Sequence, residues 1–473
     1  MRRIAPALLL AAAVYGLFWG RRLFIRSWFV QGPARPASRA EPRAGRVAPH
    51  QVRVLLIDGL SREVARRLPA LSRLCRQGLE LALDVGFPTV SLPEQHVLWT
   101  GAWQDQSGVM FLVKRMARPV YDSLPGLVTR RGGGAVAVAE GEPYIVTSFP
   151  FSRVVAPREA AGPGAGKGQL AMLTPLDLQQ ESLAAMQSSA ALVLVHFLAV
   201  DHAGHKVGSA GAAYLKEARR ADALLGALQT VRRPDQTLLV LSDHGHLRAP
   251  PGGHGGTEPG IATVRACIVG PDIPAGRRAA AVLPDVTRIL AERLDVAPPA
   301  CVGRSLAGVL RGDPPGAQAI AWRWRVWTAS GLVLGLWLVL LAWRRQPALL
   351  PWGLLLSLAL LVALEGRPSL SRYYVYRSLP WSLLPAALPT LLLPALQLFW
   401  LRRRRVRFGV TLLAAAGLLP AVIAVGLTGW PATEPPLWPQ LTAWASTLGL
   451  LGLAWLVGLA LAAALLGPGE EAT

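Results

Sequence analysis

The stretch VRVLLID at residues 52–58 decides the fold class, because a short apolar run that ends in an acidic residue is typical of a buried strand. Similar runs recur along the chain, separated by segments with helical spacing of their apolar residues. This alternation predicts an α/β domain over residues 51–310, with a mostly parallel sheet sandwiched by helices. Further strands are expected at 191–200, 237–242 and 264–269, and helices at 62–77, 212–228 and 286–294.

The composition indicates long apolar stretches outside this domain. Hydrophobic residues make up 52% of the chain and charged residues only 16%, which is too apolar for a purely soluble protein. The net charge of +21 comes almost entirely from Arg, and these residues are scattered or flank apolar segments instead of forming one basic block. We therefore expect membrane lipids as partners, attracted where they are anionic, and no nucleic acid.

Apolar segments at both ends of the chain predict membrane anchoring. Residues 1–30 are expected to form an N-terminal transmembrane anchor, with a cleaved signal peptide as the alternative. Residues 31–50, rich in Pro, Ala, Gly and Arg, are expected to form a flexible linker. About five transmembrane helices are expected within 320–466, before a tail at 467–473. The candidate spans are 320–343, 348–364, 379–400, 409–430 and 441–466.

The basic loops between these spans predict their orientation. The Arg-containing loops at 344–345 and 402–407 fall on one side, and the loop at 431–439, which has no Lys or Arg, falls on the other. Positive charge marks the cytoplasmic face, so both termini are expected in the cytoplasm and the catalytic domain outside it, in a periplasm or lumen. The basic loop at 367–377 argues against this orientation. The three cysteines allow at most one disulfide and do not fix the compartment.

Three acidic residues, Asp58, Asp201 and Asp243, stand directly after predicted strands. Because ligands bind beyond the carboxyl ends of parallel strands, we expect these side chains to meet at one edge of the sheet. Carboxylates gathered there would repel one another unless cations neutralised them. Histidines accompany them in the sequence, at His205, His244 and His254.

Mixed Asp and His sets are typical of zinc sites, and manganese is the alternative. Two such ions could clamp the attacking and leaving oxygens of a phosphoryl group. Each residue taken alone has a simpler explanation, since an Asp after a strand is usually a turn former or helix cap and a His is usually a satisfied polar residue. The combined pattern favours a site for two divalent metal ions.

The candidate nucleophile is Ser91, because a hydroxyl bound to a metal ion loses its proton more easily and can attack phosphorus. Thr89 is the alternative. A structural interpretation also exists, in which Ser91 and Glu94 form a capping box for a helix that ends near Gly101. The two interpretations are compatible, since a residue at a helix N-terminus also experiences the positive end of the helix dipole.

These segments resemble the alkaline phosphatase superfamily, in particular its phosphodiesterase and phosphotransferase branches. The motifs occur in the family's order, with Asp58 after the first strand and Pro-Thr-x-Ser-x-Pro-x-x-His at 88–96. Asp-x-x-Gly-His at 201–205, Asp-His-Gly at 243–245 and a late His254 follow. The stretches 196–208 and 254–256 are similar to the ethanolamine phosphate transferases of GPI-anchor synthesis, which also combine an extracytoplasmic catalytic domain with membrane spans.

The resemblance implies the ligand sets. One metal would be held by Asp58, Ser91, Asp243 and His244, and the other by Asp201, His205 and His254. His202 and His246 are not expected to be ligands. Two departures bear on the substrate: no Asn follows Thr100-Gly101, which disfavours the nucleotide phosphodiesterases, and the sulfatase signature is absent.

The function predicted from the sequence is a membrane-bound two-metal phosphodiesterase or phosphotransferase. It would act on a phosphorylated small molecule or lipid, such as a phosphoethanolamine headgroup, through a phosphoserine intermediate on Ser91. The alternatives are a simple extracytoplasmic phosphohydrolase, a nucleotide pyrophosphatase, and a catalytically inactive membrane scaffold with the same fold.

Overall fold

The computed structural model describes residues 50–107, 109, 121–157, 172–248, 253–256, 258–299 and 303–316, all within Phe29–Ala319, one of the two units into which the chain divides. Within these residues, eight strands form one sheet in the order β4-β3-β5-β1-β6-β7-β2-β8. All pairings are parallel except those of β7, which runs antiparallel to β6 and β2. The predicted α/β domain with a mostly parallel sheet is therefore confirmed. The strands are β1 Val52–Ile57, β2 Leu79–Asp84, β3 Ala135–Ala139, β4 Arg153–Val155, β5 Leu192–Phe197, β6 Thr237–Leu241, β7 Thr263–Val269 and β8 Arg277–Val282.

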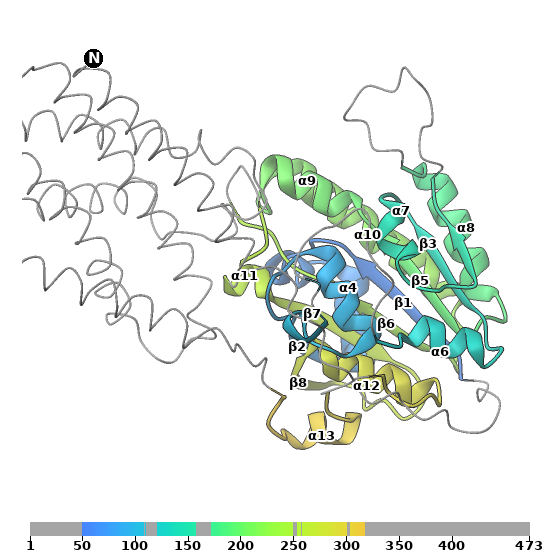
Figure 1. The fold of residues 1–473 in the computed structure, drawn as a ribbon. Helices are drawn as coiled ribbons and strands as arrows, with labels where there is room; N and C mark the ends of the chain where they lie inside the picture. The colour runs from blue at the N-terminus through green and yellow to red at the C-terminus, as the bar shows by residue number, and fades with distance from the viewer. Residues whose placement is uncertain are drawn as a thin grey trace, which may run out of the picture. The chain divides into compact units, whose positions relative to one another are not determined.

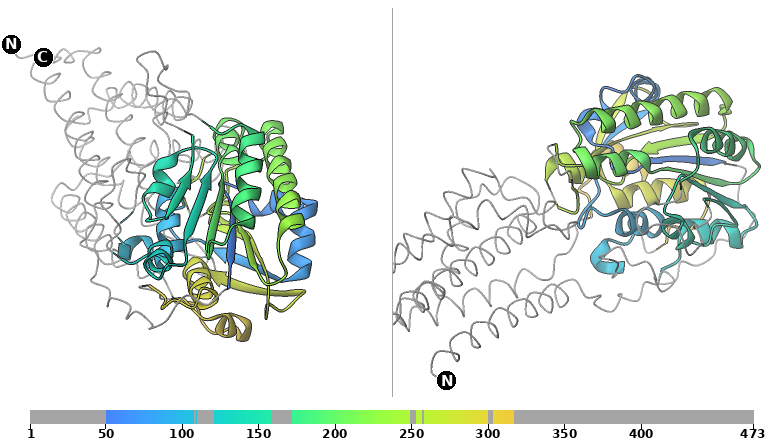
Figure 2. Two further views of the ribbon diagram at one scale, coloured as in Figure 1. Left: turned by 90° about the vertical axis from the view of Figure 1, so that its right-hand side faces the viewer. Right: turned by 90° about the horizontal axis from the view of Figure 1, so that it is seen from above.

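Helices cover both faces of this sheet (Figures 1 and 2). One layer contains α3, α8, α9 and α10, and the other contains α4, α6 and α12, as the two hydrophobic core clusters show. The longer helices are α3 Pro69–Gln77, α4 Ser91–Thr100, α8 Pro175–Gln187, α9 Ala199–Val207, α10 Ala212–Val231 and α12 Leu283–Arg293. The shorter ones are α2 Arg62–Ala65, α5 Gln104–Ser107, α6 Leu124–Arg130, α7 Pro143–Thr147, α11 Pro259–Ala262 and α13 Leu306–Arg311.

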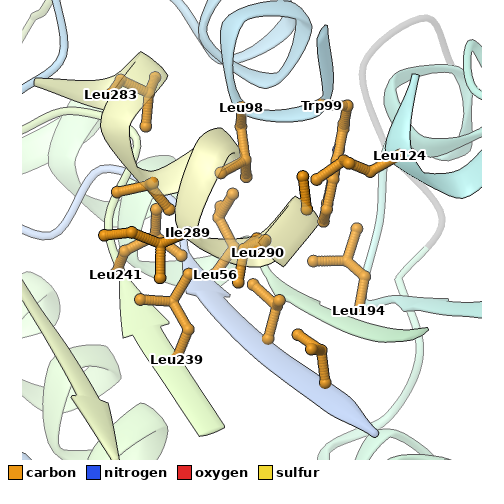
Figure 3. Packing of buried hydrophobic residues seen from close by; sticks show 14 of the residues in the cluster. Leu56, Leu98, Trp99, Leu124, Leu194, Leu239, Leu241, Leu283, Ile289 and Leu290 are labelled. Carbon is orange, nitrogen blue, oxygen red and sulfur yellow. The ribbon is translucent and has the colours of Figure 1, made fainter. Parts of the chain in front are cut away.

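Strand β1 lies near the middle of the sheet, between β5 and β6, and all six of its residues are buried. Because successive side chains of a strand point to opposite faces, Leu56 packs in one core cluster and Leu55 in the other. In Figure 3, Leu56 lies among Leu98 and Trp99 of α4 and Leu290 of α12. A continuous apolar run is what a strand covered on both faces requires.

Two predicted elements have different bounds in the structure. The strand expected at 191–200 ends at Phe197, and Asp201 lies in the first turn of helix α9 instead of directly after a strand. The helix expected at 62–77 is divided into α2 and α3, because Pro69 begins a new helix at its first position.

A disulfide joins Cys75 of α3 to Cys267 of β7, across 192 positions of the sequence. In the part of the chain that the structure describes, no helix combines the length and apolarity that crossing a bilayer requires. The expected anchor at 1–30, nearly all of the linker, the spans at 320–466 and the tail lie outside the described residues.

Candidate metal centre

Three neighbouring strands bring the acidic residues of the candidate site to one edge of the sheet. Asp58 directly follows β1, and Asp243 comes two residues after β6, its parallel neighbour. Asp201 lies in the first turn of α9, which follows β5 on the other side of β1. Since parallel strands end together, the three carboxylates converge as the sequence predicts.

The first group of candidate ligands surrounds the Ser91 hydroxyl. Ser91 Oγ lies 3.2 Å from Asp58 Oδ1 and 3.3 Å from His244 Nε2. His244 Nε2 is 3.4 Å from Asp58 Oδ1 and 3.9 Å from Asp243 Oδ2. All four side chains are buried. The four residues predicted to hold one metal therefore lie together.

The second group consists of Asp201, His205 and His254. His205 Nε2 lies 3.3 Å from Asp201 Oδ2 and 3.2 Å from His254 Nε2. His254 Nε2 lies 3.4 Å from Asp201 Oδ1. The groups are adjacent, because the rings of His244 and His254 stack with their centroids 3.7 Å apart.

These distances fit metal ligands. Atoms that share a tetrahedral zinc at about 2.0–2.1 Å lie about 3.3–3.4 Å apart, which is close to every ligand-atom separation above except the 3.9 Å between His244 Nε2 and Asp243 Oδ2. Asp243 Oδ1 accepts from the backbone N–H groups of Gly59 and His244, whereas Oδ2 is buried without a hydrogen-bond partner among the described residues. A buried orphan oxygen of this kind is what a bound cation would satisfy.

The tautomers of two histidines also fit. His244 Nδ1 lies 3.2 Å from Gly245 O, and His254 Nδ1 lies 2.7 Å from Thr89 O. A carbonyl oxygen only accepts, so each Nδ1 carries the hydrogen and each Nε2 presents a lone pair to the site. Both residues can therefore hold a divalent cation through Nε2.

The carboxylates are in an environment that favours a cation. Burial raises the pKa of Asp58 well above its usual range, and the nearby Asp243 and Asp201 raise it further. Burial would also raise the pKa of Asp201, but the charge and hydrogen bonds of His205 and His246 outweigh it and hold that pKa well below its usual range. Positive charge beside these groups is what keeps them ionised.

His246, which was not expected to be a ligand, lies within the site. Its Nε2 lies 2.8 Å from Asp201 Oδ1, and its ring is buried. Within the described residues, it is one of four that can bring ligand atoms within 4.8 Å of one another, with Asp201, His244 and His254; Asp58, Asp243 and His244 form a second such group. The sequence signal was its place two residues after His244 in the Asp-His-Gly-His motif.

His196 is a second residue that sequence reasoning did not assign to the site. It lies on β5 opposite Leu56, and its Nε2 is 2.9 Å from Asp58 Oδ2. All of β5 is buried, so no alternation in the sequence distinguishes this position. Neither His202 nor the predicted ligand His205 is in these two groups of atoms within 4.8 Å of one another, and His202 Nε2 lies 3.8 Å from Glu142 Oε1.

Ser91 begins helix α4, which ends at Thr100 with Gly101 in the left-handed conformation as its C-cap. The helix is confirmed, but the capping box is wrong: Val90 is the N-cap, and the Ser91 hydroxyl bonds to Asp58 instead of the helix backbone. Glu94 is completely buried. The short contact with Asp58 replaces the local capping bond.

Thr89 has a different task. Its hydroxyl donates to Gly256 O and accepts from Gly255 N–H, at 2.8 Å each, and its carbonyl accepts from His254 Nδ1. With both hydroxyl roles taken by backbone, Thr89 holds the loop that carries His254, and Ser91 is the hydroxyl that faces the candidate ligands.

Comparisons with known proteins are consistent with this site. Residues 148–255, which include Asp201, His205, Asp243, His244 and His254, match the family "Type I phosphodiesterase / nucleotide pyrophosphatase". This match supports the resemblance to the phosphodiesterase branch of the alkaline phosphatase superfamily that the motifs indicate. No curated protein matches the chain.

The solved structures that match the chain include three examples with low sequence identity. Murine ectonucleotide pyrophosphatase / phosphodiesterase 5 is 13% identical, with 53% of this chain and 96% of that one covered and a TM-score of 0.40. A protein in the alkaline phosphatase superfamily from Vibrio parahaemolyticus is 15% identical (62% and 78% covered, TM-score 0.41). A putative sulfatase from Bacteroides thetaiotaomicron is 14% identical (57% and 76% covered, TM-score 0.43).

Proposed function

On the premise that residues 148–255 are a type I phosphodiesterase segment of the alkaline phosphatase superfamily, we propose that this protein is a two-metal phosphodiesterase or phosphotransferase with Ser91 as its nucleophile. The observation that carries this proposal is the position of the Ser91 hydroxyl, 3.2 Å from Asp58 and 3.3 Å from His244. A hydroxyl placed among candidate metal ligands is positioned to be activated as a nucleophile.

Two divalent cations, zinc or manganese, would be held by the two ligand groups and would supply the positive charge that activates the hydroxyl and the phosphoryl group. The Ser91 hydroxyl donates to Asp58 Oδ1, which marks the path by which its proton leaves. The N-terminus of α4 favours negative charge on Ser91 Oγ.

Attack of Ser91 Oγ on phosphorus forms a phosphoserine and breaks the bond to the leaving alcohol. Water or an acceptor alcohol then attacks the same phosphorus and regenerates Ser91. Hydrolysis and transfer differ only in this second nucleophile.

We place the enzyme in a membrane, with the domain at 51–310 outside the cytoplasm. The apolar segments between 320 and 466 and the distribution of Arg among their loops support this proposal. The Cys75–Cys267 disulfide supports it independently, because disulfides persist in oxidising compartments and are rare in the cytosol.

The proposed substrate is a lipid or glycolipid that carries a phosphate ester, such as a phosphoethanolamine headgroup. The membrane segments favour a lipidic donor or acceptor, and the sequence after Thr100-Gly101 contains no Asn. A nucleotide pyrophosphatase is the second candidate, favoured by the family that residues 148–255 match. One murine neighbour with the same family name was solved in an inactive form in complex with AMP.

The test is to purify the full chain in detergent and assay phosphodiesters with lipid, nucleotide and simple aryl leaving groups. We expect turnover that EDTA abolishes and that Zn²⁺ or Mn²⁺ restores. Ser91→Ala should lower kcat at least about 10³-fold while the protein still binds metal. Ser91→Thr, which keeps a hydroxyl, is the matched control and should retain measurable turnover.

Activity that survives EDTA or the Ser91→Ala change would contradict the mechanism. If the wild-type protein turns over none of these substrates, and cells with Ser91→Ala grow as well and have the same lipid composition as cells with the wild type, the protein is an inactive scaffold. Preference for AMP-releasing substrates would select the second candidate.

A further inference from the structure

Two buried histidines stand behind the candidate ligands, one for each of two carboxylates. His196 Nε2 lies 2.9 Å from Asp58 Oδ2, and His246 Nε2 lies 2.8 Å from Asp201 Oδ1. These are hydrogen-bond distances, and they are shorter than the 3.2–3.4 Å between the ligand atoms of the same groups. Contact distance thus separates the histidines of the site into two kinds.

The hydrogen positions separate them in the same way. His244 and His254 use Nδ1–H on backbone carbonyls, so their Nε2 lone pairs face the site. In His196 and His246, Nδ1 has no partner among the described residues, and Nε2 contacts a carboxylate oxygen. Since a carboxylate only accepts, Nε2 must carry the hydrogen in these two rings, and an N–H cannot also bind a metal.

Both rings are fixed in place by their surroundings. His196 lies on β5, which is paired on one side with β1 and on the other with β3. The His246 ring packs against Gly59 and Gly204, where an added Cβ would come within 2.9 Å and 2.5 Å of it. Any larger residue at Gly204 would push the ring away from Asp201, so the glycine is part of the arrangement.

We propose that His196 and His246 are positioning residues, which donate Nε2–H to Asp58 and Asp201 and fix the orientation in which each carboxylate meets its metal ion. The proposal rests on the two-metal function above. At Asp58 the consequence is direct: Oδ2 is occupied by His196, so Oδ1 is left facing Ser91 and His244. At Asp201 the proposal means that His246 orients a metal ligand through its N–H and is not itself a fourth ligand.

The test measures metal binding by the apo-protein, independently of turnover. The full chain in detergent is stripped with EDTA and titrated with Zn²⁺ against a chromophoric chelator. We expect two bound equivalents for the wild type, and for His196→Phe and His246→Phe a 10–100-fold weaker affinity for one equivalent each. His196→Gln and His246→Gln place an amide N–H near the lost Nε2–H and should recover most of that affinity.

His96→Phe is the matched control. His96 is a buried imidazole that bonds to no carboxylate among the described residues, so its replacement has the same steric character without touching a candidate ligand. We expect its Zn²⁺ affinity to equal that of the wild type. Thermal unfolding of each apo variant shows whether it is folded. If a Phe variant is not folded, the Zn²⁺ affinity of the corresponding Gln variant tests the proposal.

Co²⁺ substitution separates support from ligation. A positioning role predicts that the Co²⁺ absorption of His246→Gln keeps the wild-type band pattern at saturation, because no ligand is lost. A changed pattern would make His246 a ligand and overturn the inference for that residue.

The remaining outcomes distinguish this inference from the proposed function. If the wild type binds two equivalents and both Phe variants bind them equally well, the positioning role is wrong and the two-metal function stands. If the wild type binds no metal, both proposals fail.

Discussion

Helix α4 buries all ten of its residues, among them the consecutive polar side chains Glu94, Gln95 and His96. Burial raises the pKa of Glu94 well above its usual range and lowers the pKa of His96 to about 4. Uncharged forms are favoured in both, since an unpaired charge has nothing to replace its lost hydration. Helix α4, which presents Ser91, is therefore sensitive to protonation of His96, a residue that is not a candidate metal ligand.

His96 should make the fold less stable in acid. Its pKa is about 4 in the folded state and about 6.5 when unfolded, so the unfolded chain binds the extra proton first as the pH falls. Stability is therefore full above about pH 6.5 and declines down to about pH 4, by roughly 3 kcal/mol for this group. Unfolding measured in EDTA across this range should show a smaller acid loss in His96→Phe than in the wild type.

The difference in unfolding free energy between the wild type and His96→Phe is compared across the pH range, because the contribution of the other histidines cancels in this difference. Parallel stability curves for the wild type and His96→Phe would show that His96 does not titrate with a depressed pKa.

At the scale of elements, the start of helix α9 is held by a side chain from the residue that follows β3. The helix carries Asp201 and His205 one turn apart but has no side-chain cap of its own. Glu140, just after β3, accepts from Leu198 N–H and Ala199 N–H at 2.8 Å each. Its other oxygen pairs with Arg220. A carboxylate at a helix N-terminus is favourable, so Glu140 fixes the turn from which the candidate ligands project.

Glu140→Ala should destabilise the domain by about 2–3 kcal/mol, because it leaves two N–H groups without an acceptor and removes the ion pair of the buried Glu140 with the partly exposed Arg220. Chemical denaturation measures the loss, and faster amide exchange at residues 198–200 would localise it. Glu63→Gln, which removes the exposed ion pairs of Glu63 with Arg67 and Arg248, is the control and should leave the midpoint unchanged. Equal effects of the two changes would contradict the capping role.

At the scale of the whole domain, one sheet joins segments that are far apart in the sequence. The central β1 contacts β5 and β6, which begin about 140 and 185 residues later, and the disulfide ties α3 to β7 over a similar distance. Such non-local contacts carry a large cost in chain entropy, which a covalent link reduces by restricting the unfolded chain.

The disulfide predicts a thiol count. The denatured, unreduced protein should titrate one thiol, and the reduced protein three, since the chain has three cysteines. Cys75→Ser should lower stability by about 2–4 kcal/mol in thermal or chemical unfolding. Three reactive thiols before reduction would rule out the disulfide and remove its support for an oxidising compartment.

The sequence alone determined the fold class and most of the site, because both depend on local patterns. Apolar runs covered on both faces indicate buried strands, and acidic residues placed after parallel strands must converge. Asp58 and Asp243 could be found in this way, with His244 beside Asp243, whereas Ser91 was chosen over Thr89 from the motif at 88–96. The boundary at Leu198 could not, since Ala199 and Val200 continue an apolar run that is strand before them and helix after.

The role of each histidine follows from the packing of the folded chain. The sequence gives no sign that His196 meets Asp58 across 138 positions. The Asp-His-Gly-His motif places His246 near the site, but only the packing shows that it meets Asp201 while the Nε2 lone pair of His254 faces the site. The capping box failed for the same reason, because Asp58 competes for the Ser91 hydroxyl. Local rules describe what a residue can bond to, whereas strand register and packing fix which partner reaches it.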